Sequence, residues 1–250
     1  MKNLVSQHVR VSYQRLPPAL DGLRIVQVSD IHFTFRSSRR YRRLREQIVA
    51  ASPDVIAFTG DMVNHHRWWD RAVDWIAALP AEIPKVAVPG NWEYRAAGGA
   101  GPFRRSMERA GVRPLLNQAA LIPVRDGIIQ VVGFDDIRYG RFEPDAAFKD
   151  IDPDQFVVAL CHNPDILLYT DPDRFDLLLC GHTHGGQVRM PRYGAITTST
   201  RLGKRYEAGR YELAPERYLY VSRGLGEGHI WVRLLCPPEL VVVTLHSLRA

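Results

Sequence analysis

Short apolar segments that each end at a glycine or a polar side chain recur along this chain of 250 residues and limit the folds open to it. Segments of this length and composition are typical of buried strands in a sheet whose two faces are both covered. In open α/β sheets, ligands usually bind outside the carboxyl ends of the strands. We therefore predict an α/β fold with a binding site at the strand ends. The five segments are Leu23–Ser29, Val55–Thr59, Lys85–Pro89, Phe156–Cys161 and Phe175–Cys180.

Each of these five segments is followed at once by residues that can bind a metal ion. Taken singly, each could be a turn or capping residue, and two surface histidines can lie this close by chance. Five such endings in order along one chain are hard to explain by turn chemistry. The residues are Asp30, His32, Asp61, Asn91, His162, His182 and His184.

The side chains of this set indicate more than one metal ion. One divalent ion needs only about four protein ligands, so the set suits two ions that share a bridging carboxylate. Nitrogen and oxygen ligands without thiolate fit Mn, Fe or Zn and argue against Mg or Ca. Two ions about 3.5 to 4 Å apart are suited to displacement at phosphorus, because they bind phosphoryl oxygens and lower the pKa of a shared water.

The rest of the chain fits one large domain spanning residues 1–250, because there is no linker, repeat or low-complexity segment. We predict helices at Phe35–Ala51, Trp68–Leu79 and Phe103–Ala110. Further strands are predicted at Val9–Tyr13, Leu115–Val124, Ile128–Phe134, Tyr218–Ser222, Ile230–Leu235 and Leu240–Leu245, with a hairpin turn at Asp126-Gly127.

Charge and composition bear on the partner and the compartment. The net charge of +6 suits an anionic partner, and six arginines fall in the predicted helix between Arg36 and Arg45. That helix is either a solvated surface or a patch facing phosphate or a membrane. No apolar run approaches about 20 residues, and there is no apolar signal segment. With three cysteines and no CxxC, the expected location is the cytoplasm, with peripheral contact at the inner face of the membrane as a further expectation.

The motifs DIH, GDMVN, GNWE, CHN and GHTHGG, between residues 30 and 187, resemble those of the calcineurin-like metallophosphoesterases in order and spacing. The later GLGEG and CPPEL are similar to the branch that contains small bacterial phosphodiesterases and UDP-2,3-diacylglucosamine hydrolases. The resemblance implies a four-layer α/β/β/α sandwich of two mixed β-sheets flanked by helices. It also implies hydrolysis of a phosphodiester or pyrophosphate bond by a metal-bridging hydroxide.

The resemblance also assigns the ligands. The first ion would be held by Asp30, His32 and His184. The second would be held by Asn91, His162 and His182, and Asp61 would bridge the two. Asp61, Asn91 and His162 are accordingly candidate catalytic residues as well as ligands.

One position departs from the family pattern. Members commonly carry a histidine after the asparagine of the third motif, and here that residue is Trp92. Indole cannot act as a general acid, a role typically worth about 10² to 10⁴ in rate. Either His65 or His66 takes this role, or the leaving group is acidic enough to need no proton, as in a pyrophosphate or an aryl ester.

The expected partner is an anionic, phosphate-containing small molecule or a lipid-linked nucleotide, with a UDP-2,3-diacylglucosamine-type substrate as the first candidate. A nuclease of the same superfamily is the alternative within enzymes. Nucleic acid is disfavoured because no ladder of stacking aromatic and basic side chains is evident. A non-catalytic scaffold with the same fold is the alternative outside enzymes, and the filled ligand positions argue against it. The oligomeric state is left open.

Overall fold

Two six-stranded mixed sheets form the body of the protein in the computed structural model, which describes residues 4–34, 38–228 and 231–248. The first sheet has the order β1-β14-β2-β3-β4-β5, and the second has the order β12-β13-β9-β8-β7-β6. Strands β2, β3, β4 and β5 run parallel to one another, as do β13, β9, β8 and β7. Both sheets are mixed because β2 is antiparallel to β14, β6 to β7 and β12 to β13.

The strand bounds of the first sheet are β1 Val5–Tyr13, β14 Glu239–Ser247, β2 Arg24–Val28, β3 Val55–Thr59, β4 Lys85–Val88 and β5 Arg113–Pro114. Those of the second are β12 Gly209–Ala214, β13 Arg217–Val221, β9 Leu177–Cys180, β8 Val157–Leu160, β7 Gly127–Gly133 and β6 Gln118–Val124. A separate two-stranded hairpin is formed by β10 Arg189–Met190 and β11 Gly194–Ala195. The α-helices are α1 Ser38–Ala50, α2 Trp69–Ala77, α3 Asn91–Ala96, α4 Ala100–Arg109 and α5 Pro144–Ala147.

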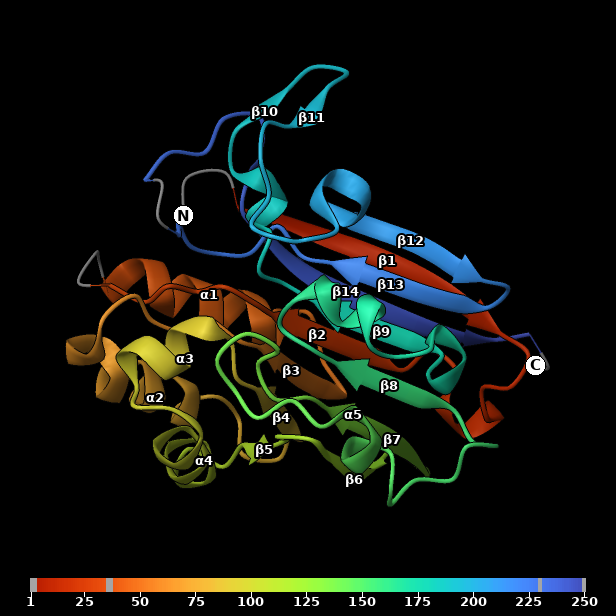
Figure 1. Ribbon diagram of the computed structural model, residues 1–250. Helices are drawn as coiled ribbons and strands as arrows, with labels where there is room; N and C mark the ends of the chain where they lie inside the picture. The colour runs from red at the N-terminus through yellow and green to blue at the C-terminus, as the bar shows by residue number, and fades with distance from the viewer. Residues whose placement is uncertain (1–3, 35–37, 229–230, 249–250) are drawn as a thin grey trace.

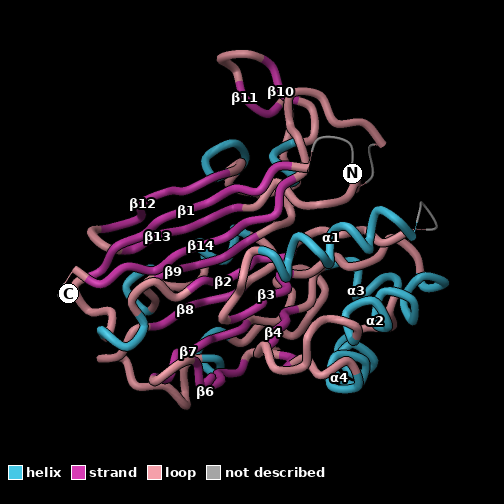
Figure 2. Tube along the Cα trace, turned by 180° about the vertical axis from the view of Figure 1, so that it is seen from behind, coloured by secondary structure: helices cyan, strands magenta, loops and turns pink. Residues whose placement is uncertain are grey.

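Helices cover the outer faces of the two sheets unequally. Helices α1 to α4 gather on one side of the molecule, as Figures 1 and 2 show, and α1, α2 and α4 share an apolar cluster with the outer face of the first sheet. The outer face of the second sheet is covered by α5, short 3-10 helices and loops. The predicted four-layer α/β/β/α arrangement is thus confirmed, with a thin fourth layer.

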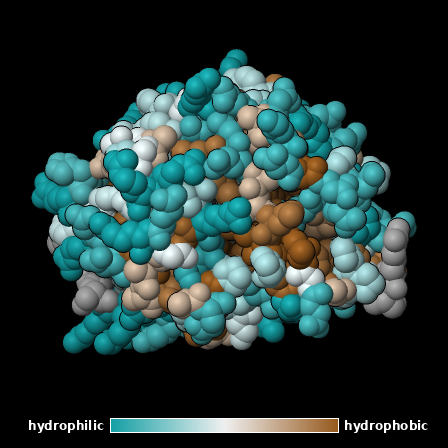
Figure 3. Space-filling view, turned by 90° about the horizontal axis from the view of Figure 1, so that it is seen from below, coloured by the Kyte–Doolittle hydropathy of each residue, from teal (hydrophilic) through white to brown (hydrophobic). Residues whose placement is uncertain are grey.

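A single apolar core fills the space between the sheets. It takes inward-facing side chains from both, including Val241 and Val243 of β14 and Val158 and Leu160 of β8. Burial of each such side chain stabilises the fold by roughly 1.5 to 3 kcal/mol. The three cysteines are buried and free. The face seen from below is mainly hydrophilic, with hydrophobic side chains gathered near its centre (Figure 3).

The apolar residues of the basic helix α1 are spaced so that they lie on one face of the helix. Tyr41, Leu44 and Ile48 recur every three or four residues and are buried against the first sheet. The opposite face is exposed, and there Arg42 pairs with Glu46 one turn later at 3.7 Å. The first three residues of the predicted helix, 35–37, which include Arg36, lie outside the described part of the chain.

The predicted strand Ile230–Leu235 is wrong. Ile230 lies outside the described residues, and the segment 231–235 contains only an isolated bridge between Leu234 and Val188. Its apolar side chains are mostly exposed, so the apolar run does not mark a buried strand. No helix in the described part of the chain is both long and apolar enough to cross a membrane.

Candidate metal centre

The seven predicted ligands all lie where strands of the two sheets end. Asp30, Asp61 and Asn91 follow β2, β3 and β4 of the first sheet, and His162 follows β8 of the second. His182 and His184 follow β9. Because neighbouring strands within each of these sets are parallel, their carboxyl ends meet at one edge. The fold therefore brings together residues up to 154 positions apart, the separation of Asp30 and His184.

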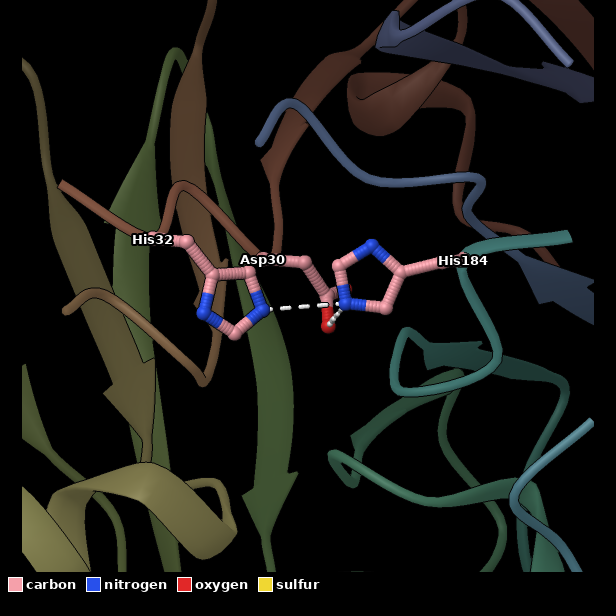
Figure 4. A group of neighbouring side chains, drawn as sticks. All are labelled: Asp30, His32 and His184. Atoms are coloured by element: carbon pink, nitrogen blue, oxygen red, sulfur yellow. Dashed lines mark hydrogen bonds and ion pairs between the residues drawn. The ribbon is translucent and has the colours of Figure 1, made fainter. Parts of the chain in front are cut away.

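One group of potential ligands consists of Asp30, His32 and His184. Their ligand atoms lie within 4.8 Å of one another. The Nε2 atoms of the two imidazoles are 2.9 Å apart, and His184 Nε2 lies 3.3 Å from Asp30 Oδ1 (Figure 4). All three residues are buried. These are the residues that the family resemblance assigns to the first ion.

The second group consists of Asp61, His162 and His182, and its tautomers can be inferred from their partners. His162 Nδ1 lies 2.8 Å from the Thr59 carbonyl, and His182 Nε2 lies 3.2 Å from the Ser199 carbonyl. A carbonyl can only accept, so each neutral ring carries its proton on that nitrogen. Once His162 has lost its second proton, the lone pairs of His162 Nε2 and His182 Nδ1, 3.1 Å apart, would face each other. That arrangement suits a cation in place of the proton.

Asp61 stands between the two groups. Its Oδ2 is 3.3 Å from His162 Nε2 and 3.8 Å from His32 Nε2. Beside it, Asn91 Oδ1 is buried without a hydrogen-bond partner, an arrangement that is costly unless a ligand completes it. The donor set therefore fits two divalent ions, with a carboxylate placed where a shared ligand is needed.

The backbone of the site is strained in a way that the sequence did not predict. Asp30 and His32 both have left-handed backbones, with φ of 51° and 45°. Asp61, His182 and His184 also have positive φ, at 55°, 69° and 52°. Non-glycine residues rarely adopt this conformation, and each instance costs on the order of 1 kcal/mol or more.

Two glycines allow the ligand-bearing segments to approach one another. A Cβ on Gly90 would overlap the Asp61 carboxylate and lie 2.8 Å from the Asp61 amide nitrogen. A Cβ on Gly181 would overlap the side chains of Ser29 and Asp30. The glycine before the paired histidines thus leaves room for the neighbouring ligand and its hydrogen-bond partner.

Burial and mutual charge shift the pKa values of these groups. Burial raises the pKa of Asp30 to about 7 and lowers those of His32 and His182 to about 4. Burial also acts against the charged form of His162, but the Asp61 carboxylate outweighs it and raises the pKa of His162 to about 10. The same pairing overcomes the effect of burial on Asp61 and holds its pKa well below the usual range.

Glu93 is a buried residue of the site to which the sequence reasoning assigned no role. Its Oε2 accepts hydrogen bonds from the backbone N–H groups of Gly90 at 2.7 Å and Asp61 at 2.9 Å, and its Oε1 accepts from Met62 at 2.7 Å. It thereby joins the loops after β3 and β4. The spacing of Gly90 and Glu93 at the start of α3 is that of a capping box, and this signal could have indicated its role.

A pocket of about 330 Å³ opens over the site. It is bordered by Trp92 and by two arginines that sequence reasoning did not identify, Arg95 and Arg138. The Arg95 guanidinium lies 5.5 Å from the centre of the Trp92 ring and 4.9 Å from that of the Tyr139 ring, and it donates a hydrogen bond to the Tyr139 hydroxyl. Aromatic contacts on two rings hold this cation at the pocket rim.

The two histidines considered as general acids do not line this pocket. His65 caps a 3-10 helix, where its Nδ1 accepts from the Arg67 backbone at 3.3 Å. His66 is exposed, and its ring lies 4.2 Å from that of His65. Of the described residues that border the pocket, the histidines are His182 and His184, which belong to the two ligand groups.

Comparison with known proteins identifies the family. The family model described as calcineurin-like phosphoesterase matches residues 23–186, which include all seven predicted ligands. The chain belongs to this family. It is therefore a metal-dependent hydrolase of phosphoric esters, and the enzyme class expected from the motifs is confirmed. Members use two metal ions, in agreement with the two groups of ligands.

Relatives extend the match over most of the chain. An uncharacterized metallophosphoesterase of Bacillus subtilis, YkuE, is 31% identical over 93% of this chain and 82% of its own length. The Escherichia coli phosphodiesterase YaeI is 36% identical over 79% of this chain and 72% of its own. The Chlamydia trachomatis UDP-2,3-diacylglucosamine pyrophosphatase LpxG is 26% identical over 90% of this chain and 84% of its own length. The predicted branch is thus confirmed.

A solved structure supports the fold. The NAD nucleotidase of Haemophilus influenzae superposes with a TM-score of 0.52 at 12% identity, over 84% of this chain and 50% of its own. At that identity the likeness extends to the arrangement of strands and helices alone.

Proposed function

We propose that this enzyme hydrolyses a phosphodiester or pyrophosphate bond whose leaving group is acidic, with a nucleotide-linked lipid of the UDP-2,3-diacylglucosamine type as the first candidate substrate. The proposal includes Asp30, His32 and His184 as ligands of one ion, and Asn91, His162 and His182 as ligands of the other, with Asp61 between them. Mn, Fe or Zn would suit this mixture of imidazole and oxygen donors.

The observation that carries the proposal is the pocket rim. Trp92 occupies the position where related enzymes commonly have a histidine, and the adjacent charged groups are the guanidiniums of Arg95 and Arg138. A guanidinium stays protonated at neutral pH, so it binds an anion but does not donate a proton to a leaving alkoxide. A leaving group that departs as a stable anion, such as a phosphate monoester or a phenolate, needs no such proton.

The chain's own residues divide the remaining tasks. When bound, the two ions would supply positive charge that binds phosphoryl oxygens and makes water acidic enough to attack at neutral pH. Arg95, held between two aromatic rings, would bind the second phosphate of a pyrophosphate or the departing anion. The backbone N–H of Trp92 donates to Asp61 Oδ1 at 2.9 Å, and this bond orients the shared carboxylate. The relative that acts on UDP-2,3-diacylglucosamine supports this choice of candidate.

The decisive experiment is a series of phosphodiesters with leaving groups of increasing pKa, assayed on the Mn-loaded enzyme. We expect rapid hydrolysis of aryl esters, a steep fall toward alkyl esters, and turnover of UDP-2,3-diacylglucosamine. A rate that is independent of leaving-group pKa would contradict the proposal, unless His65→Ala or His66→Ala then removed activity on alkyl esters.

The dependence on metal is tested separately. Asp61→Asn should lose both bound metal and hydrolysis of bis(p-nitrophenyl) phosphate. Asp126→Asn, which alters an exposed carboxylate in the β6–β7 turn, should lose neither. Full activity of the Asp61 variant would exclude a shared carboxylate. If the wild-type protein is metal-free and inactive and cannot be reconstituted with metal, the non-catalytic scaffold with the same fold would be favoured instead.

A further inference from the structure

Large apolar side chains are exposed on two short segments beside the pocket. Residues 190–196 and 231–235 together hold seven of the fifteen large hydrophobic residues that are exposed in the described part of the chain. Such side chains are common singly on protein surfaces, but a concentration of them marks an interaction surface. They are Met190, Tyr193, Ile196, Trp231, Val232, Leu234 and Leu235, with exposed fractions between 51% and 62%.

Backbone hydrogen bonds join the two segments into one structure. Leu234 donates to the Gln187 carbonyl at 2.9 Å and accepts from Arg189 at 3.0 Å, and Ile196 donates to Val188 at 3.1 Å. The β10–β11 hairpin stands out beyond the ends of both sheets in Figures 1 and 2. At its base Leu235 borders the same hollow as Met190 and Tyr193 of the hairpin. We call these seven side chains the apolar projection.

The exposed charges around the apolar projection are mainly positive. Glu207 borders the same hollow, but it is paired with Arg189 at 2.5 Å and accepts from the Ala195 backbone N–H at 2.9 Å. Arg192, Lys204 and Arg205 are exposed, and the Lys204 ammonium lies 3.3 Å from the centre of the Tyr193 ring. Apolar side chains with a cationic border complement a surface that offers both hydrocarbon and negative charge. Tryptophan and tyrosine are also favoured at the boundary between lipid and water.

We propose that the apolar projection docks on an anionic lipid bilayer. The projection adjoins the pocket: Thr197, which follows Ile196, lines it, and so does Gln187, whose carbonyl accepts from the Leu234 N–H. Docking through the projection would hold the pocket mouth beside the lipid headgroups. The sequence left open a membrane-facing patch on the basic helix α1, whereas the apolar projection lies in residues 190–196 and 231–235. The proposal goes beyond the proposed function, because lipid binding does not require a particular substrate.

The test is co-sedimentation of the full chain with vesicles of phosphatidylcholine alone or with added phosphatidylglycerol. We expect binding that depends on phosphatidylglycerol. The double variant Trp231→Ala/Leu235→Ser should lower the partition coefficient by about tenfold or more, because two large apolar side chains no longer enter the bilayer. The matched control is Leu121→Ser/Ile128→Ser, which removes side chains of similar exposure, 50% and 57%, from the β6–β7 hairpin, and it should bind as wild type does.

Hydrolysis of bis(p-nitrophenyl) phosphate in solution, measured on all three proteins, separates the outcomes. Unchanged hydrolysis with lost vesicle binding in the Trp231/Leu235 variant alone supports docking and shows that the variant is folded. Equal binding by both variants, or no preference of wild type for phosphatidylglycerol, overturns the proposal. Sedimentation velocity supplies a further outcome. Self-association that is abolished by the same variant would assign the surface to contacts between copies of the chain and would also overturn it.

Discussion

Replacing Glu93 by glutamine exchanges one hydrogen-bond acceptor at the centre of the site for a donor. The glutamine oxygen can take the place of Oε2 and keep the bonds from Gly90 and Asp61. The amide nitrogen then faces the Met62 N–H, which loses its acceptor. The side chain of Glu93 is fully buried, so water cannot replace the missing partner.

The magnitude follows from these three bonds. A buried donor without a partner costs about 1 to 3 kcal/mol, and loss of the negative charge weakens the other two bonds by roughly 0.5 to 1 kcal/mol each. These losses sum to about 3 kcal/mol. Burial and the neighbouring Asp61 carboxylate raise the pKa of Glu93 to about 7, so the ionised side chain is disfavoured in the folded protein and a neutral amide offsets part of the loss. At pH 8, where the carboxylate predominates, we therefore expect a net destabilisation of about 1 to 3 kcal/mol.

The assay is urea unfolding in EDTA followed by circular dichroism, with hydrolysis by the metal-loaded protein measured in parallel. The loop carrying Asp61 should shift, and a displacement of about 1 Å can cost about 10²-fold in rate. Glu46→Gln is the control, because Glu46 is exposed and its pair with Arg42 contributes little. A loss below about 1 kcal/mol together with unchanged turnover would refute the role assigned to Glu93.

Three further predictions concern the protons and the packing of the site. Metal binding requires neutral imidazole and ionised carboxylate, so Mn uptake at pH 7 should release more than one proton per chain, mainly from His162 and Asp30. Calorimetry in two buffers of different ionisation enthalpy measures the number of protons released. If no proton is released, the pKa values assigned to His162 and Asp30 are contradicted. In EDTA, the raised pKa of His162 contributes stability that is complete below about pH 6.5 and is lost as the pH rises to about 10. The melting temperature should therefore fall over that range in wild type and less in His162→Gln. Gly90→Ala should destabilise the protein by about 1 to 3 kcal/mol and displace Asp61, whereas Gly101→Ala, with its nearest neighbour at 3.5 Å, should do neither.

The sequence was informative where burial and chemistry coincide. Strands β3, β8 and β9, which precede four of the ligands, are wholly buried runs of mostly apolar residues, so their composition marks them clearly. The polar residues at their ends are also the ones that the structure brings together. The left-handed backbones of Asp30 and His32 could not be foreseen, because hydrophobic pattern reports burial and not φ.

Most of the site features that could not be predicted from the sequence depend on contacts between distant loops. Arg95 and Arg138 meet at the pocket only through folding, although Arg95 stands just after the GNWE motif in the sequence. Strand β12 is a half-exposed edge strand without a strong apolar alternation. The segment 231–235 was predicted to be a strand because it is apolar, although its side chains face outward. Exposed apolar runs of this kind are the ones that sequence patterns misassign.

The two ligand groups draw on both sheets, and this has a consequence for the lifetime of the protein. Asp30, Asp61 and Asn91 belong to the loops of one sheet, and His162, His182 and His184 to those of the other. Ions bound there would tie the two halves of the sandwich together at one end, in addition to the apolar core between them. A ligand that binds only the folded state at about 100 times its Kd adds about 2.7 kcal/mol of stability. The quantity of folded enzyme in a cell, and its resistance to proteolysis, would then follow the supply of metal.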